Sequence, residues 1–325
     1  MYSRSRYSRR SVLAGLCALP VVMFGAAMGV PVISSARAAA SRDISAKGLQ
    51  EMLAELEASS GGRLGVAASV SNGDEILSYR GNERFPMCST FKVLAASAIL
   101  RDKPGILEQR IHFAKSDIQP WSPVTEKHLE DGMTVAELCA AMLQHSDNTA
   151  ANLVLAQLGG PEGLTSIARS FGDTTFRLDR WEVELNTAIP GDARDTTTPL
   201  AMCSTLNGLL CGNLLKAPAR KQLTDWMLGC ATGAGRTPAG APEGWRSAHK
   251  SGSGENGTAN DVGVLLPPNN PEQATTHKGK NKPLVVALYL TGSTLTGPEN
   301  DKLLAQATRL VCAAEGLATP LDNMY

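Results

Sequence analysis

The 325-residue sequence lacks the marks of a metal-binding or nucleic-acid-binding protein. Its five histidines show no ligand spacing, and no Cys-x-x-Cys motif occurs, which argues against a zinc site. The formal net charge is zero. Five arginines and no acidic residue lie in the first forty positions, and the remainder carries 26 basic and 31 acidic side chains, a net charge of −5. A mildly acidic body without a basic cluster argues against a nucleic-acid partner.

The first forty residues, 1–40, are expected to be an export signal peptide that is removed. Residues 8–13 (SRRSVL) resemble a twin-arginine signal, an apolar run follows from Val12 to Ile33, and small-residue cleavage sites lie within Ala36–Ala40. A retained membrane anchor is the alternative. No second apolar stretch of membrane length occurs, so we expect a bacterial periplasmic or secreted protein with no membrane association after signal removal.

Six cysteines remain once the leader, with Cys17, is removed. An exported protein could pair some of them, and the sequence leaves the pairing open. They are Cys88, Cys139, Cys203, Cys211, Cys230 and Cys312.

Hydrophobic periodicity predicts strands near both ends of the chain and helices between them. A first helix is predicted over residues 45–58, followed by strands over 63–70 and 75–80 joined at Asn72-Gly73, a strong hairpin signal. Thr134 and Glu137 form a predicted capping box within the helical region. Three more strands are expected over 245–251, 258–266 and 284–290, and a closing helix over 298–314.

This order of elements predicts an α+β fold with two lobes. One lobe, residues 41–86 and 229–325, is an antiparallel five-stranded sheet flanked by the terminal helices. The other, residues 87–228, is all-α and is inserted into it. Residues 176–198 show no period, and a long ordered loop in a compact domain is usually functional.

A candidate nucleophile lies in the stretch Met87–Lys92, which precedes the apolar run Val93–Leu100. The run predicts a buried helix with Ser89 as its N-cap. Lys92 follows one turn later on the same face, where burial would lower its pKa and let it take the serine proton. Alone the pattern is weak, because Ser247–Lys250 also matches and because Ser-x-x-Lys is usually a cap and a surface lysine.

Two further motifs add weight to this pair. Ser146-Asp147-Asn148 lies at a predicted helix junction and could simply be a helix cap. Lys250-Ser251-Gly252 lies late on a predicted strand and could be an edge-strand lysine beside a glycine bulge. The order Ser-x-x-Lys, Ser-Asp-Asn, Lys-Ser-Gly is similar to the motif set of class A β-lactamases and penicillin-binding proteins.

The chain resembles class A serine β-lactamases from about Ala46 to the C-terminal helix, most clearly in residues 123–129, 146–155 and 177–198. The resemblance implies hydrolysis of penicillins and cephalosporins, and thus antibiotic resistance. It also implies a monomer that takes a small-molecule β-lactam and needs no cofactor or metal. Residues 177–195 would form the Ω loop of the family, clamped by an ion pair between Arg180 and Asp195.

The resemblance also assigns catalytic roles. Ser89 would attack the cyclic amide, and its proton would leave through Lys92 or through Glu182 and a water. Ser146 would pass a proton to the departing nitrogen, steadied by Lys250. Glu182 would then activate the water that cleaves the ester.

Other residues would bind and orient the substrate. Asn148 would hold its side-chain amide, and Asn186 would orient the water. Backbone N–H groups of Ser89 and Ser253 would form the oxyanion hole, where one donor is worth about 10²–10³ in rate. Trp121 would lie at the mouth of the cleft, with a buried core tryptophan as the alternative.

The substrate carboxylate needs a cation. Many relatives place an arginine on the strand after the Lys-Thr-Gly motif, where this chain has Ala259. Others use an arginine ahead of the motif, and Arg236, fourteen residues before Lys250, fits that pattern; a surface arginine is the alternative. Ser251, in place of the commoner threonine, would assist with its hydroxyl.

Some positions depart from the family. Val183 stands where relatives often have proline, which leaves the backbone there open. Cys139 matches half of a disulfide found in some members, but Ala96 holds the partner position. Cys88 occurs in extended-spectrum and carbapenemase subfamilies, but the carbapenemase bridge would need a cysteine near Gly254, so carbapenem hydrolysis stays open.

Three alternatives share part of this pattern. A D,D-peptidase or penicillin-binding protein would lack a deacylating glutamate, and the segment around Glu182 argues against it. A β-lactam sensor would acylate once and would need a membrane span or second domain, which only the N-terminus could supply. An inactive homologue would have a misplaced Ω loop.

Overall fold

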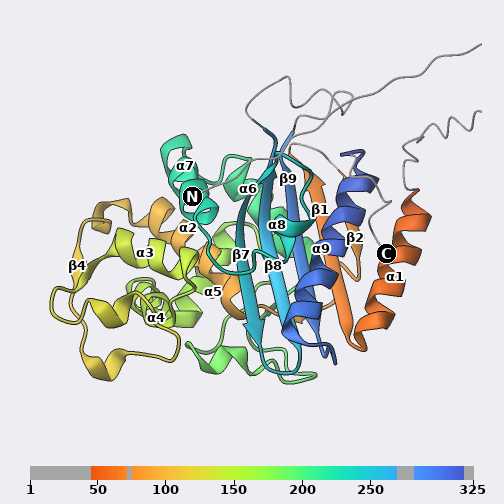
Figure 1. The fold of residues 1–325 in the computed structure, drawn as a ribbon. Helices are drawn as coiled ribbons and strands as arrows, with labels where there is room; N and C mark the ends of the chain where they lie inside the picture. The colour runs from red at the N-terminus through yellow and green to blue at the C-terminus, as the bar shows by residue number, and fades with distance from the viewer. Residues whose placement is uncertain (1–44, 72–74, 269–281, 318–325) are drawn as a thin grey trace, which may run out of the picture. The chain divides into compact units, whose positions relative to one another are not determined.

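A five-stranded antiparallel sheet organises the computed structural model, which describes residues 45–71, 75–268 and 282–317 (Figure 1). The strand order is β2-β1-β9-β8-β7, so the last strand in sequence pairs with the first and closes the sheet after the helical insertion. The predicted sheet is confirmed. Its strands are β1 (Arg63–Val70), β2 (Leu77–Tyr79), β7 (Arg246–Gly254), β8 (Thr258–Leu266) and β9 (Leu284–Thr291).

Alternation along the strands separates two apolar cores. On β9, Val285, Ala287 and Tyr289 face the helical region, whereas Leu284, Val286, Leu288 and Leu290 face the other side. That second face is covered by α1 (Ala46–Ser60) and α9 (Gly297–Ala314), which lie side by side at one edge of Figure 1. The terminal helices therefore flank the sheet as predicted.

Helices form most of the segment between β2 and β7. Every residue of α2 from Lys92 to Leu100 is buried, so this helix runs through the middle of the core. The predicted capping box of Thr134 and Glu137 opens α3. The helices are α2 (Lys92–Asp102), α3 (Val135–Gln144), α4 (Asn148–Gln157), α5 (Gly160–Ser170), α6 (Pro199–Leu210), α7 (Ala217–Leu228) and the short α8 (Thr237–Gly240).

The predicted N-cap role of Ser89 is wrong. A 3-10 turn, η1 (Cys88–Phe91), precedes α2, and its N-cap Met87 makes no side-chain capping bond. Ser89 lies inside this turn, and its hydroxyl donates to Glu182, far away in the sequence, instead of accepting from a backbone N–H of the helix as a cap would. The serine is therefore held out of the capping role and available for chemistry.

A two-stranded sheet that periodicity could not predict fixes this turn in space. β3 (Phe85–Pro86) pairs with β6 (Thr196–Thr197), and Met87 N donates to Asp195 O at 2.9 Å. The chain just before Ser89 is thereby tied to the end of the 177–195 loop. A second short pair joins β4 (Arg110–Ile111) to β5 (Met133–Thr134).

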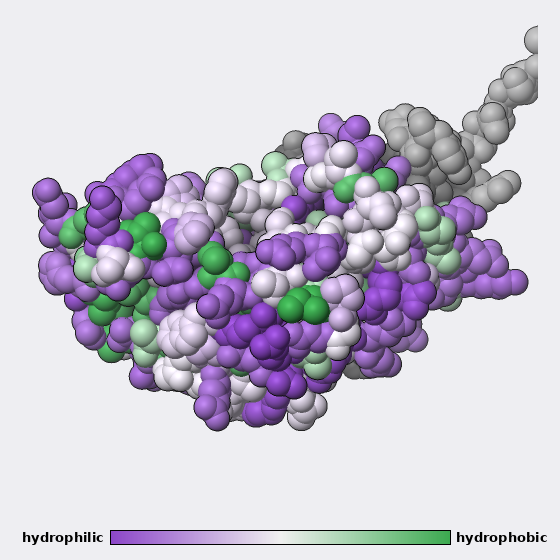
Figure 2. Space-filling view, turned by 90° about the horizontal axis from the view of Figure 1, so that it is seen from below, coloured by the Kyte–Doolittle hydropathy of each residue, from purple (hydrophilic) through white to green (hydrophobic). Residues whose placement is uncertain are grey.

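Some predictions fall outside the described residues. The export segment 1–40 and the Asn72-Gly73 turn do so, as does most of the predicted loop 267–282, while the lobe boundaries at 87 and 228 stay predictions. Among the described helices, none is long and apolar enough to cross a membrane. On the face seen in Figure 2, apolar residues form only small separate patches on a largely hydrophilic surface.

Candidate active site

The nucleophile candidate Ser89 lies where η1 meets strand β7. Its side chain is buried, and its hydroxyl donates to Glu182 Oε1 at 3.3 Å. Gly252 of β7 comes so close that a Cβ atom there would lie 3.3 Å from Ser89 N and 3.0 Å from Met87 O. A side chain at 252 would push the strand away from the turn, so glycine permits the two backbones to meet.

Lys92 connects three parts of the site from the first turn of α2. Its Nζ lies 2.9 Å from Glu182 Oε1, 2.9 Å from Ser146 O and 2.7 Å from Asn148 Oδ1. The lysine is fully buried, and this burial lowers its pKa, while the neighbouring Glu182 carboxylate acts in the opposite direction. The predicted direction of the shift is confirmed, although the Ser89 hydroxyl points to Glu182 rather than to Lys92.

Lys250 and Ser146 meet across the site. Lys250 Nζ donates to Ser146 Oγ at 3.0 Å and to Ser251 O at 2.7 Å. β7 is an edge strand, as the alternative reading of Lys250 expected, but Lys250 is fully buried and the pairing of β7 with β8 runs through Gly252 without a bulge. Burial, reinforced by the charge of Lys92, lowers the pKa of Lys250 to about 7. The motif of residues 146–148 also contains the expected cap, because Asp147 accepts from Ala150 N at the start of α4.

Glu182 is held at both its side chain and its backbone. Asn186 Nδ2 donates to Glu182 Oε2 at 2.5 Å. The amide of Asn152 on α4 accepts from Glu182 N at 3.0 Å and donates to Glu182 O at 2.9 Å. Sequence reasoning missed the role of Asn152, although this residue lies within residues 146–155, where the resemblance to the family is clear. The Glu182–Val183 peptide bond, whose conformation the sequence left open, is cis.

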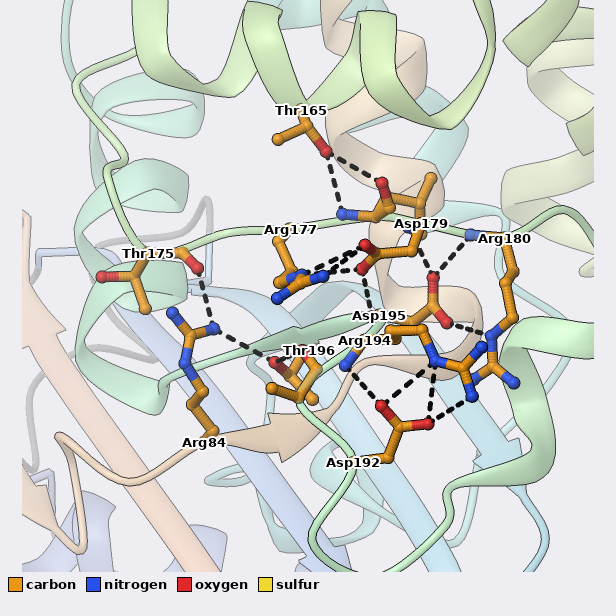
Figure 3. A network of polar contacts seen from close by, with 12 residues as sticks. Arg84, Thr165, Thr175, Arg177, Asp179, Arg180, Asp192, Arg194, Asp195 and Thr196 are labelled. Atoms are coloured by element: carbon orange, nitrogen blue, oxygen red, sulfur yellow. Dashed lines mark hydrogen bonds and ion pairs between the residues drawn. The ribbon is translucent and has the colours of Figure 1, made fainter.

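A polar network closes the loop that carries Glu182 (Figure 3). Arg180 Nε and Asp195 Oδ2 lie 2.6 Å apart, which confirms the predicted ion pair. Asp195 Oδ1 also accepts from the backbone N–H groups of Asp179 and Arg180, and Asp179 Oδ2 accepts from Asp195 N. The two ends of the loop are thus joined by reciprocal hydrogen bonds, and Arg177 neutralises Asp179 at 2.6 Å.

Arg236 is buried, so the alternative of a surface arginine is wrong. Its Nε lies 2.6 Å from Asp301 Oδ1, its Nη1 donates to Gly252 O and Asn260 O at 2.8 Å, and its Nη2 donates to Ser253 Oγ at 2.8 Å. The cation therefore reaches the end of β7 next to the position of Ala259, which pairs with Ser253.

The remaining predicted site residues surround this centre. Trp121 is 64% exposed, which rules out the core alternative, and its Nε1 donates to His145 O. Ser253 is exposed, and Ser251 Oγ lies 2.7 Å from Thr232 Oγ1. Asn148 Nδ2 donates to Pro120 O, so its amide is oriented at both ends.

The six cysteines left open by the sequence are all free. Cys88 is buried beside the nucleophile, and a Cβ atom added at Gly254 would lie 2.7 Å from its Sγ. Among the described residues, no group of three histidine, cysteine or carboxylate side chains could hold a metal ion.

Known proteins share both the sequence and this architecture. A family model described as "Beta-lactamase enzyme family" matches residues 47–314. The chain is 47% identical to the β-lactamase OXY-1 of Klebsiella oxytoca over 295 residues, which cover 90% of this chain and 96% of that protein. It is 46% identical to the carbapenem-hydrolysing β-lactamase KPC of Klebsiella oxytoca, with coverage of 82% and 88%.

Solved structures of β-lactamases have the same architecture as this chain. The class A β-lactamase of the last common ancestor of Gram-negative bacteria (GNCA4) matches with a TM-score of 0.77 and 52% identity, covering 82% of this chain and 99% of that one. A putative class A β-lactamase, PenP from Rhodopseudomonas palustris, gives a TM-score of 0.77 and 48% identity, with coverage of 82% and 99%. The chain therefore belongs to the β-lactamase enzyme family and is a class A serine β-lactamase, an enzyme that hydrolyses β-lactams and so confers antibiotic resistance.

Proposed function

We propose that this enzyme opens the β-lactam ring of penicillins and cephalosporins through an acyl-enzyme on Ser89, which water activated by Glu182 then hydrolyses. The observation that carries the proposal is the position of one carboxylate oxygen. Glu182 Oε1 contacts the Ser89 hydroxyl at 3.3 Å and the Lys92 ammonium at 2.9 Å. A nucleophile, a base and a charged group that orients the base therefore meet at one atom.

Acylation begins with removal of the Ser89 proton. The carboxylate of Glu182 is the acceptor within reach of the hydroxyl, either directly or through a water, and Lys92 stabilises its negative charge. As the serine oxygen attacks the amide carbon, negative charge develops on the carbonyl oxygen. Backbone N–H groups of Ser89 and Ser253 would stabilise it, and the close approach of Gly252 to Ser89 N supports that arrangement.

Ring opening needs a proton on the leaving nitrogen. Ser146 is suited to deliver it, because its Oγ accepts from Lys250 Nζ at 3.0 Å and lies 3.5 Å from Lys92 Nζ. Two ammonium groups beside one hydroxyl favour release of its proton and can replace it afterwards.

Deacylation would use Glu182 as a general base toward water. Asn186 supports this step, because its Nδ2 holds Glu182 Oε2 while its buried Oδ1 has no hydrogen-bond partner among the described atoms. An acceptor at that point can orient a water beside the carboxylate. A peptidase or sensor, which stays acylated, has no need of this pair.

Substrate recognition would use polar groups around the nucleophile. Asn148 would hold the side-chain amide, and exposed Trp121 would pack against the substrate at the cleft mouth. Lys250 and Ser251 would bind the carboxylate, with Arg236 adding positive charge near Ser253. We further propose that the protein is exported through its twin-arginine-like leader to the periplasm or medium and acts as a monomer.

Turnover of a chromogenic cephalosporin by the purified enzyme tests the proposal. Absorbance should continue to change over many enzyme equivalents, and a penicillin should behave alike. A burst of about one equivalent followed by nothing would mean that Ser89 acylates without deacylation, and the sensor or peptidase alternative would then replace the proposal.

A further inference from the structure

A buried asparagine on β8, Asn260, takes no part in the steps above. Its side chain is fully buried, and its Nδ2 donates to Pro86 O at 2.8 Å and to Met87 O at 3.1 Å. Its Oδ1 accepts from Leu290 N on β9 at 3.3 Å. Both ends of the amide are therefore bonded to backbone groups, and these hydrogen bonds set the distance between the sheet and the segment that contains Pro86 and Met87.

The two carbonyl groups that Asn260 binds lie directly before the nucleophile. Pro86 ends β3, and Met87 is the N-cap of the turn η1, which contains Ser89. Met87 O also accepts from Thr90 Oγ1 at 2.9 Å, inside the same turn. The side chain of Asn260 therefore links the sheet to the start of the turn that carries the nucleophile.

The main chain of Asn260 contacts the other half of the site. It pairs with Gly252 of β7, the residue before Ser253. Arg236 Nη1 donates at 2.8 Å to both Asn260 O and Gly252 O. Side chains alternate along a strand, so the side chain of Asn260 lies on the same face of β8 as that of Val262, which packs into the helical core. One residue therefore contacts both the strand β7 and the chain that leads into η1.

These two elements supply the backbone N–H groups proposed for the oxyanion hole, Ser89 N from η1 and Ser253 N from β7. The elements approach each other closely at Gly252, where an added Cβ atom would lie 3.3 Å from Ser89 N. A shift of either element would change the spacing of the two N–H groups. Since an oxyanion hole depends on donors that are fixed before the reaction begins, a contact that holds the turn against the sheet serves catalysis directly.

We propose that Asn260 is a positioning residue that holds the N–H groups of Ser89 and Ser253 at the spacing of the oxyanion hole. It acts through the carbonyl groups of Pro86 and Met87 and does not touch the substrate. The proposal rests on the oxyanion hole of the proposed function. Acylation and deacylation both pass through a tetrahedral oxyanion, so loss of Asn260 should slow the two steps together and leave KM nearly unchanged.

The test measures the acylation rate, the deacylation rate and the Ki of phenylboronic acid in Asn260→Ala. A boronic acid adds to the serine oxygen as a tetrahedral anion, so its Ki reports on the geometry of the oxyanion hole without turnover. Both rate constants should fall by a similar factor, about tenfold to 10²-fold, and Ki should rise by a comparable factor. KM should change by less than about twofold, and no burst should appear.

Asn300→Ala is the matched control. Asn300 is also a buried asparagine, but it lies on α9, on the other face of the sheet, and its Oδ1 accepts from Ser293 Oγ at 2.7 Å. Both variants lose a buried amide with its hydrogen bonds, so both should unfold more easily. Asn300→Ala should keep Ki and both rate constants within about twofold of the original. The same result for Asn260→Ala, or a fall in deacylation alone, would overturn the proposal.

Two further measurements cover the case in which Asn260→Ala does not fold. Asn260→Ser is a smaller change, and its hydroxyl is too short to reach both carbonyl groups, so it should show the same pattern. In the unaltered enzyme, the side-chain N–H resonances of Asn260 should exchange with solvent far more slowly than those of exposed Asn256 and should shift when phenylboronic acid binds. Fast exchange, or resonances that stay in place, would contradict the inference.

The boronic acid also separates this inference from the proposed function. If phenylboronic acid does not inhibit the unaltered enzyme, the proposed mechanism through Ser89 fails. If it inhibits the unaltered enzyme and the folded Asn260 variants equally, only the role of Asn260 fails.

Discussion

The sheet and the 177–195 loop are stabilised in opposite ways. The sheet depends on a ladder of backbone pairs and on alternating apolar side chains such as Val285 and Val286, which pack into the cores on its two faces. The loop contains little regular structure beyond the 3-10 turn Glu184–Thr187 and depends on charged side chains that bind its own backbone. Burial of apolar side chains has no preferred direction, whereas a hydrogen bond sets the distance and angle between two particular groups.

This difference suits what each region does. The sheet carries Lys250 on a strand paired along its whole length, so it supplies a rigid platform. The loop must place a single carboxylate between Ser89 and Lys92, and a chain without a ladder can reach that point only if several polar contacts direct it. Changes in the loop should therefore affect turnover, and changes in the sheet should affect stability.

Among substitutions that leave the catalytic side chains unchanged, the largest effect is expected from Asp195→Ala. The variant leaves Arg180 and two backbone N–H groups without their acceptor, and loss of one partner of a largely buried pair costs about 3–5 kcal/mol. Displacement of Glu182 should also lower kcat about 10²-fold. Stopped-flow measurement of substrate turnover by the folded variant gives this fall in kcat. The pair Arg194–Asp192, which is more exposed than Arg180–Asp195, offers the control, since Asp192→Ala should change kcat by less than about twofold.

A substitution in the sheet should lower stability and leave turnover almost unchanged. Leu288→Ala removes a fully buried side chain between the sheet and the terminal helices and should lower the free energy of unfolding by about 2–5 kcal/mol. Turnover per folded molecule should stay within about twofold of the original, because no catalytic group touches this core. Urea unfolding and active-site titration together give both numbers. A large fall in kcat at unchanged stability would contradict the separation of the two regions.

The sequence predicted the sheet far better than the loop, because long-range contacts between polar side chains determine the course of the loop. Short runs of residues bounded by turn signals such as Asn72-Gly73 marked the five strands, and β1 and β8 begin and end where they were expected. Caps such as Thr134 were also visible, because capping depends on a few neighbouring residues. The site residues came mainly from a family resemblance, since Ser89, Ser146 and Lys250 meet only through long-range packing.

What the sequence could not predict depends on such packing as well. Asn152 looked like an ordinary residue of an apolar helix, and its role as a clamp for Glu182 exists only in the folded chain. The capping role expected of Ser89 failed because a 3-10 turn replaces the first turn of the helix.

A smaller effect on the loop is expected from Asn152→Ala. It removes both hydrogen bonds from the Glu182 backbone and leaves a donor and an acceptor without partners, which costs about 1–3 kcal/mol. The loop can move, so we expect kcat to fall about tenfold through slower deacylation. Pre-steady-state kinetics should show a burst that the unaltered enzyme lacks. If acylation slows instead and no burst appears, the clamp serves another step.

The smallest effect is a pH dependence. Since burial lowers the pKa of Lys250 to about 7, about half of it is charged at pH 7, and the ammonium is lost as the pH rises further. For substrates with a free carboxylate, kcat/KM should therefore decline above about pH 7. A β-lactam with an esterified carboxylate should show a weaker decline. Equal profiles for the two substrates would separate Lys250 from carboxylate recognition.

The most direct test of the account is intact-mass analysis of Glu182→Ala mixed with a penicillin. The variant should gain the mass of one intact substrate molecule on Ser89 and keep it, while steady turnover falls by about 10²–10⁴-fold. Ser89→Ala should gain no mass, which assigns the adduct. A Glu182→Ala protein that forms no adduct would contradict the division of labour between the serine that acylates and the glutamate that releases it.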